Sequence, residues 1–186
     1  MVDRASALDR KYNIGKNPIN DSIGIEFKKI NNIKLNQVAC WPNTFDKVGS
    51  LLAKHLNVSE YSKANKAIYN KSKVLLRIEP LKWWVLESDL PLLSTQDGTT
   101  LDLSHSFTQI KISGGDSKTF LNRFLPLDLR DFSFPINHCA SSAIHHVSIK
   151  LWRSNDEYNL FIPRGFALSL WELFIDTARQ FGFEVK

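Results

Sequence analysis

The sequence predicts an α+β fold built from two halves, each with the β-α-β-β-α-β order of ferredoxin-like units. Three observations lead to this prediction. Short runs of alternating apolar and polar residues recur along the chain, two segments carry an apolar stripe at helical spacing, and the order of elements occurs twice. We expect one domain over residues 21–186, with approximate halves 21–105 and 106–186, preceded by an arm over 1–20 that is flexible or docks on a partner.

The first half begins with two apolar runs at 22–30 and 33–41. They flank Asn31-Asn32, which predicts a hairpin because Asn tolerates positive φ. A helix is expected from about residue 44 to 56, since one side of this segment is apolar at helical spacing. Asn43 is its expected N-cap.

Two more strands of this half are expected at 73–79 and 82–88. Pro80 lies between them, at a break, because proline has no N–H to donate to a sheet. The second helix of this half is weak, since the segment that should form it is short and contains Pro91.

The alternating runs at 99–104 and 107–113 are further strand candidates. After them Gly114-Gly115 turns the chain. Asp116 is expected to cap a short helix, which ends before Pro126.

A last helix is predicted from about Phe166 to Phe181, with a buried stripe on one side. Gly182 occupies the place of a left-handed residue after a helix, and residues 183–185 are expected to form a closing strand. The stripe consists of Phe166, Leu170, Leu173, Phe174, Ala178 and Phe181.

The composition indicates a globular protein. Of the 186 residues 43% are hydrophobic, and the 2 Cys are too few for a disulfide framework. The 12 Phe and 5 Trp exclude a disordered chain, and no apolar run is long enough to span a membrane. The N-terminal residues lack the apolar core of a secretory signal, so we expect a cytoplasmic location and no membrane partner.

The net charge of +5 is unevenly distributed, with a basic first part and a slightly acidic remainder. A basic surface attracts nucleic acid, acidic proteins or anionic ligands. The basic residues are scattered singly or in pairs, however. We therefore prefer a solvated basic face and expect no nucleic-acid partner.

Four residues resemble a metal cluster at first sight: His138, Cys139, His145 and His146. On a strand, adjacent His145 and His146 point to opposite faces, and an extended segment separates His138 from His146 by about 26 Å. No CxxC or HxxxH spacing occurs in the sequence. We therefore expect core or edge histidines and no metal on this chain.

Two other segments contain residue types found in active sites. Residues 102–106 hold Asp, Ser and His, but consecutive strand residues cannot relay a proton, and no G-x-S-x-G turn is present. Gly114-Gly115-Asp116 lacks both phosphate-binding glycine patterns, which favours a plain turn with a cap over an anion site. We predict no catalytic and no cofactor-binding residue on this chain.

Aromatic and apolar residues outside these patterns indicate candidate docking positions. Trp83 and Trp84 lie on a strand, so one is expected to face the core and the other a helix or a partner. Trp171 is expected in the core. The loop from Leu125 to Pro135 either tucks under the domain or forms an exposed patch that a partner covers. Its four large apolar residues are Leu127, Leu129, Phe132 and Phe134.

The most specific sequence features are Pro126-Leu127-Asp128-Leu129, Phe134-Pro135 and the last helix. By these features the chain resembles, over about residues 36–186, the gamma subunits of heterotetrameric sarcosine oxidases. The chain departs from the family pattern at Glu79, at Phe124-Leu125 and at Gly165, where Gly, a Gly-Cys pair and Ser are usual. The resembling segments are Gln37–Leu56, Leu75–Ser88, Phe120–Ser142 and Leu160–Val185.

This resemblance implies a folate-binding, aminomethyltransferase-like fold. It also implies a non-catalytic subunit, with alpha, beta and delta partners, of the complex that converts sarcosine to glycine, hydrogen peroxide and 5,10-methylenetetrahydrofolate. FAD, FMN, NAD, tetrahydrofolate and zinc are expected on the other subunits. The Lys-Gly-Cys-x-x-Gly-Gln-Glu signature of related folate-binding proteins is absent from the sequence, so no residue is assigned to folate.

Two other functions stay open: a stand-alone folate-binding one-carbon protein, and a basic RNA-binding module whose affinity falls steeply with salt. A structural subunit acts by burying apolar surface against its partners. On that hypothesis, the arm over residues 1–20 and the loop from Leu125 to Pro135 are the expected docking elements.

Overall fold

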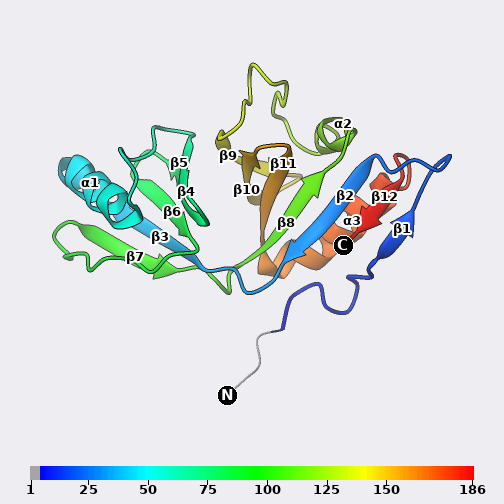
Figure 1. Ribbon diagram of the computed structural model, residues 1–186. Helices are drawn as coiled ribbons and strands as arrows, with labels where there is room; N and C mark the ends of the chain where they lie inside the picture. The colour runs from blue at the N-terminus through cyan, green and yellow to red at the C-terminus, as the bar shows by residue number, and fades with distance from the viewer. Residues whose placement is uncertain (1–4) are drawn as a thin grey trace. The chain divides into compact units, whose positions relative to one another are not determined.

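The computed structural model describes residues 5–186, which form two compact units (Figure 1). Unit 1 comprises the chain up to Asn32, Ser106–Ile136 and Ser141–Lys186, and unit 2 comprises Ile33–His105 and Asn137–Ala140. The sequence analysis placed residues 21–32 with the first half, whereas they belong to the same unit as the second half. Residues 1–4 of the expected arm lie outside the described residues.

A seven-stranded sheet forms the framework of unit 1, in the order β1-β12-β2-β8-β11-β10-β9. Along the chain, β8, α2, β10, β11, α3 and β12 follow the predicted β-α-β-β-α-β order, with an additional strand, β9, between α2 and β10. In the sheet, β2 is inserted between β12 and β8. The bounds are β1 (Gly15–Asn17), β2 (Ile25–Ile30), β8 (Phe107–Ser113), α2 (Ser117–Leu121), β9 (Cys139–Ile144), β10 (Val147–Ser154), β11 (Glu157–Pro163), η2 (Arg164–Phe166), α3 (Ala167–Ala178) and β12 (Phe183–Val185).

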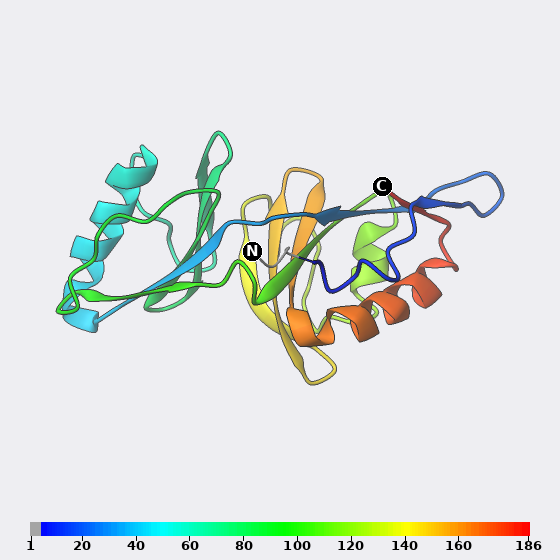
Figure 2. The same ribbon diagram turned by 90° about the horizontal axis from the view of Figure 1, so that it is seen from below.

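Both helices of unit 1 cover the same face of this sheet (Figure 2). Phe27 of β2 lies between them, because Phe120 of α2 and Trp171 of α3 pack edge-on against its ring, with centroids 5.5 and 5.3 Å away. Trp171 is buried as predicted. These aromatic contacts add to the burial energy that holds the helices on the sheet.

Unit 2 is a five-stranded sheet in the order β4-β5-β6-β3-β7. Strands β3, β5, β6 and β7 have the same order in this sheet as β8, β10, β11 and β12 have in the sheet of unit 1. No helix forms between β6 and β7, in the segment that contains Pro91 and was expected to form only a weak helix. The bounds are β3 (Leu35–Cys40), η1 (Pro42–Thr44), α1 (Phe45–Leu56), β4 (Ala67–Asn70), β5 (Lys73–Glu79), β6 (Lys82–Leu86) and β7 (Gly98–Asp102). An α+β fold with two sheets is therefore confirmed.

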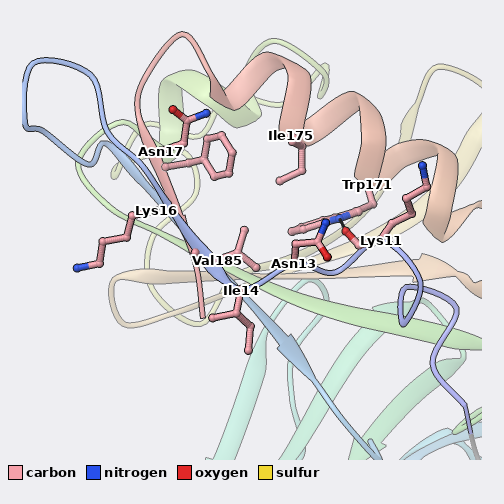
Figure 3. Close-up of a pocket in the computed structure, with 10 residues that line it drawn as sticks. Lys11, Asn13, Ile14, Lys16, Asn17, Trp171, Ile175 and Val185 are labelled. Atoms are coloured by element: carbon pink, nitrogen blue, oxygen red, sulfur yellow. Dashed lines mark hydrogen bonds between the residues drawn. The ribbon is translucent and has the colours of Figure 1, made fainter.

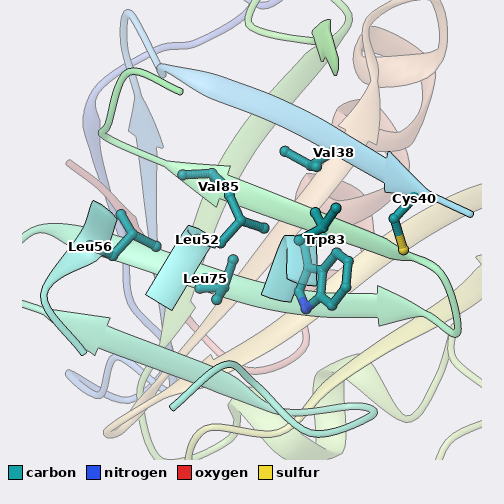
Figure 4. Close-up of a cluster of buried hydrophobic side chains, with 8 residues drawn as sticks. Val38, Cys40, Leu52, Leu56, Leu75, Trp83 and Val85 are labelled. Carbon is teal, nitrogen blue, oxygen red and sulfur yellow. The ribbon is translucent and has the colours of Figure 1, made fainter. Parts of the chain in front are cut away.

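Helix α1 packs its apolar stripe on this sheet, as Figure 4 shows. Val48, Leu52 and Leu56 of the helix meet Trp83 and Val85 of β6, all less than 2% exposed, together with neighbours from β3 and β5. The predicted helix is confirmed to within a residue, but its N-cap is wrong. Residues 42–44 form a 3-10 turn that begins at a proline, so the cap position falls on Thr44 instead of Asn43.

The predicted hairpin around Asn31-Asn32 is also wrong. Strand β2 pairs with β8 and β12, and β3 pairs with β6 and β7, so the two runs enter different sheets. Asn32 does adopt a positive φ of 53°. The local signal for a turn was correct, but alternation along a strand does not name the partner of that strand.

Residues 5–17 of the arm pack on unit 1 of their own chain. Leu8 is fully buried, and the Tyr12 hydroxyl accepts a hydrogen bond from the Lys29 amide at 2.6 Å and donates one to the Lys186 carbonyl at 2.7 Å. Trp171 donates its indole N–H to the Lys11 carbonyl at 3.1 Å. The described part of the arm is therefore held by contacts with its own unit.

Among the described residues, no helix has both the length and the apolar character needed to cross a membrane.

Candidate docking site

The loop after α2 divides its four apolar residues between inside and outside. Leu129 and Phe134 are 0% and 6% exposed, Leu127 is half-buried, and Phe132 is 76% exposed. The sequence left two alternatives open for the set as a whole: the structure tucks Leu129 and Phe134 under the domain and leaves Phe132 exposed. We call residues 125–136 the docking loop.

Asp128 organises this loop through its carboxylate. The Arg130 amide donates to Asp128 Oδ1 at 3.1 Å, which closes an Asx-turn, and the Ser133 hydroxyl donates to Oδ2 at 2.7 Å. The Arg130 guanidinium adds Nε to Oδ1 at 2.8 Å and Nη2 to Oδ2 at 2.6 Å. Hydrogen bonds from Arg130 and then Ser133 hold the pKa of the Asp128 carboxyl far below its usual range.

The same guanidinium supports the exposed ring. The Arg130 Cζ atom lies 4.6 Å from the centroid of Phe132, within the range of a cation–π contact. Phe132 is therefore a large apolar side chain that faces solvent on a loop whose backbone and neighbouring side chains are fixed. Such preorganisation lowers the entropy that binding has to overcome.

Arg153 of β10 attaches the loop to the sheet. The residue is 7% exposed, and its Nη1 donates to the Phe134 carbonyl at 2.8 Å and lies 2.6 Å from Asp131 Oδ1. Lys118 of α2 also donates to this Asp131 oxygen at 2.6 Å. Hydrogen bonds from Lys118 and Arg153 lower the pKa of Asp131. A buried guanidinium requires such partners, so the loop and Arg153 stabilise one another.

Trp83 and Trp84 offer nothing to a partner, because both are buried, at 0% and 1% exposure. Trp83 packs under α1 with Phe45, whose ring is stacked on it at 4.9 Å. Trp84 donates its indole N–H to Gln37 Oε1 at 3.3 Å. The sequence analysis allowed one of the two to face a partner, and this alternative is wrong.

The residues that resembled a metal cluster do not converge. His145 and His146 form the turn between β9 and β10, with His145 at a φ of 52°, rather than the strand that the sequence analysis assumed. His138 contacts the Lys66 amine instead. Within residues 5–186, no group of three or more His, Cys, Asp or Glu is placed to hold a metal ion.

In the Asp-Leu-Ser-His-Ser segment, Asp102 and Ser104 form hydrogen bonds with backbone groups. The Ser104 hydroxyl accepts from the Leu35 amide at 3.0 Å and donates to the Leu35 carbonyl at 3.3 Å. Asp102 accepts from the Ser104 amide at 2.8 Å.

Cys139 is buried, and this burial raises the pKa of its thiol to about 12. A serine tied to two backbone groups and a protonated thiol are poor nucleophiles.

A shallow groove lies beside the arm, between β1, β12 and α3 (Figure 3). Its volume is about 280 Å³. Trp171, Ile175 and Val185 contribute apolar lining, and Lys11 and Lys16 line opposite sides of the groove. Ile14, also part of the lining, is 77% exposed. Both lysines are paired with carboxylates, Lys11 with Glu172 at 3.4 Å and Lys16 with Glu184 at 3.5 Å, so the groove carries little free charge.

The two units define an α+β fold with one sheet in each unit. Known proteins share features with this chain. The sequence is 26% identical over 93 residues to the sarcosine oxidase subunit gamma of Corynebacterium sp. (strain P-1), which is 50% of this chain and 46% of that protein. The chain thus matches about half the length of this curated relative. No protein-family model matches the sequence.

The fold is shared with solved structures. A chain of the heterotetrameric sarcosine oxidase from Corynebacterium sp. U-96, in complex with pyrrole 2-carboxylate, superposes with a TM-score of 0.78 at 15% identity, covering 96% of both chains. The glycine cleavage system aminomethyltransferase T from Bartonella henselae gives 0.60 at 15% identity, covering 88% of this chain and 48% of that one. The predicted aminomethyltransferase-like fold and the resemblance to a gamma subunit are confirmed.

Proposed function

We propose that the chain is the gamma subunit of a heterotetrameric sarcosine oxidase, where it holds alpha, beta and delta subunits together without catalysing a step itself. The observation that carries this proposal is the superposition over 96% of both chains on a chain of such a complex. The complex would convert sarcosine to glycine, hydrogen peroxide and 5,10-methylenetetrahydrofolate in the cytoplasm. FAD, FMN, NAD, tetrahydrofolate and zinc would reside on the other subunits.

The local chemistry supports a structural role. Ser104 of the Asp-Leu-Ser-His-Ser segment and Cys139 are buried and engaged with backbone groups. In the docking loop, in contrast, two aspartates, two arginines and a lysine take part in the contacts that hold the loop around one exposed phenylalanine. An aromatic anchor on a rigid support is typical of the centre of a protein interface.

We assign the main partner contact to Phe132 and a lesser contact to Leu127, which is half-buried in the same loop. Leu129 and Phe134 then act indirectly, because they fasten the loop to unit 1. The groove beside residues 11–17 is a second docking candidate, which agrees with the role expected for the arm.

The test is co-expression of the four subunits with an affinity tag on a subunit other than this chain. We expect Phe132→Asp to reduce the amount of this chain that co-purifies by about tenfold or more, as for an interface anchor. The matched control is Leu92→Asp, because Leu92 is 100% exposed in unit 2. Recovery of the Phe132→Asp chain at the level of the control would contradict docking through this loop, and a wild-type chain that fails to co-purify would contradict the proposed function.

A stand-alone folate-binding protein is the second candidate, because the fold is shared with aminomethyltransferase T. Titration calorimetry of the purified full-length chain with tetrahydrofolate separates the two functions. Micromolar binding would favour the folate-binding protein. On the subunit hypothesis we expect no heat of binding, with the complex itself as the positive control.

A further inference from the structure

The hairpin of β4 and β5 carries an uncompensated positive charge. Four lysines, Lys63, Lys66, Lys71 and Lys73, fall in a segment that contains no acidic residue between Glu60 and Glu79. We call these four residues the lysine edge. All four belong to unit 2.

The lysine edge differs from the other lysines of the chain. Within residues 5–186, none of Lys63, Lys71 and Lys73 has a carboxylate within ion-pair distance, and Lys66 contacts the His138 ring instead. Most other lysines do have such a partner. Those with a carboxylate within 4 Å are Lys11, Lys16, Lys29, Lys34, Lys47, Lys82, Lys111, Lys118 and Lys186.

Two of these lysines flank one strand. β4 is an edge strand of its sheet, and Lys66 and Lys71 lie directly before and after it. Lys73 is paired with Asn70 across the hairpin. Tyr69, which is 50% exposed, lies between the two ends of β4.

The backbone of this edge is partly closed. The Ala67 amide donates to the Asn137 carbonyl at 2.7 Å, and the Cys139 amide donates to the Asn65 carbonyl at 3.0 Å. An added strand therefore finds these groups already paired. What the edge offers to a partner is the charge of its side chains.

We propose that the lysine edge is a docking surface for an acidic face of a partner protein. This inference rests on the proposed function, in which the partner is another subunit of the complex. Carboxylates from a partner compensate these positive charges and steer association. A partner protein fits better than a single-stranded nucleic acid, because the edge presents a single exposed ring, whereas strand-tracking proteins use series of stacking aromatics in a groove.

The test uses the assembled complex, immobilised through a tag on another subunit and washed with increasing NaCl. We expect the triple variant Lys63→Glu, Lys71→Glu, Lys73→Glu to be retained about tenfold less than the wild-type chain at 150 mM NaCl. The neutral triple variant, with Gln at the same positions, should lie between the two, which separates a charge effect from misfolding. Lys66 is left intact because of its contact with His138.

The matched control reverses three exposed basic residues outside the arm and the docking loop, in the variant Lys28→Glu, Lys54→Glu, Arg179→Glu. It makes the same change in net charge and should be retained like the wild-type chain. Equal retention of the lysine-edge and control variants would overturn the inference, while Phe132→Asp would still test the proposed function separately. Binding of a 20-nucleotide RNA that is lost in the lysine-edge variant, with assembly unchanged, would also overturn it.

Discussion

The Arg130 guanidinium forms a two-point contact with the carboxylate of Asp128, two residues earlier in the chain, with Nε 2.8 Å from Oδ1 and Nη2 2.6 Å from Oδ2. This short-range pair closes the turn that separates the buried Leu129 from the exposed Phe132. The shape of the docking loop therefore depends on a charge-assisted contact that forms within the loop itself. Arg153 then attaches the finished turn to β10.

The Asp128 carboxyl should titrate well below an ordinary aspartate, since hydrogen bonds from Arg130 and Ser133 favour its charged form. A carboxyl whose pKa is lowered in the folded state stabilises that state above its unfolded pKa of about 3.9, and loses this contribution as the pH falls through the lower folded value. We expect the Asp128 carboxyl carbon to keep its ionised NMR chemical shift at pH 4. In Arg130→Gln, the midpoint should move up towards the usual range, and an unchanged midpoint would contradict the role given to Arg130.

Phe134 and Phe132 should respond differently to truncation, although they lie two residues apart. Phe134→Ala removes a ring that is 6% exposed, and we expect a loss of about 3 kcal/mol in the free energy of unfolding. Phe132→Ala removes a ring that is 76% exposed and should change this free energy by less than about 0.5 kcal/mol. Urea unfolding of the purified chain measures both. Equal losses would show that Phe132 is part of the core.

The best-predicted elements are those whose signals lie within the element. The last helix was predicted over 166–181 and forms over Ala167–Ala178, three residues shorter at its end. Phe166, expected in the buried stripe, is 45% exposed. Gly182 adopts a φ of 68° before the closing strand β12, as its position predicted. The strand at 107–113 also matches β8. In these segments, burial on one side and a residue suited to positive φ are sufficient, because no distant partner has to be identified.

The features that could not be predicted depend on distant contacts. β2 alternates like a hairpin strand, but it joins β8, whose residues lie more than 70 positions further along the chain, as the pairing of Phe27 with Ile112 shows. The docking loop is similar, because Arg153 fixes the Phe134 carbonyl from 19 residues away. The Asp128-x-Arg130 spacing was a usable local signal for the turn, and the sequence analysis did not use it.

Cys139 should be inert in the native protein. Burial raises the pKa of its thiol to about 12, so almost no reactive thiolate exists at pH 8. Burial also raises the pKa of Cys40, which is 6% exposed. We expect Ellman's reagent to modify neither thiol in the folded chain at pH 8 and both in guanidinium chloride. Rapid modification of the native Cys139→Ser variant would assign the reactivity to Cys40 and contradict the expectation for that residue.

Gly49→Ala should destabilise unit 2, although alanine is the better helix former by about 1 kcal/mol. A Cβ at residue 49 would lie 2.7 Å from Cγ of Tyr61, too close for any real contact. The Tyr61 ring cannot move aside freely, because it packs edge-on against Phe45 and its hydroxyl donates to Asp46 at 2.5 Å. We expect a net loss of about 1–2 kcal/mol in the free energy of unfolding, measured in urea. The matched control is Gly165→Ala, where an added Cβ meets nothing within 4 Å and stability should not fall; an equal response of the two variants would mean that Tyr61 yields without cost.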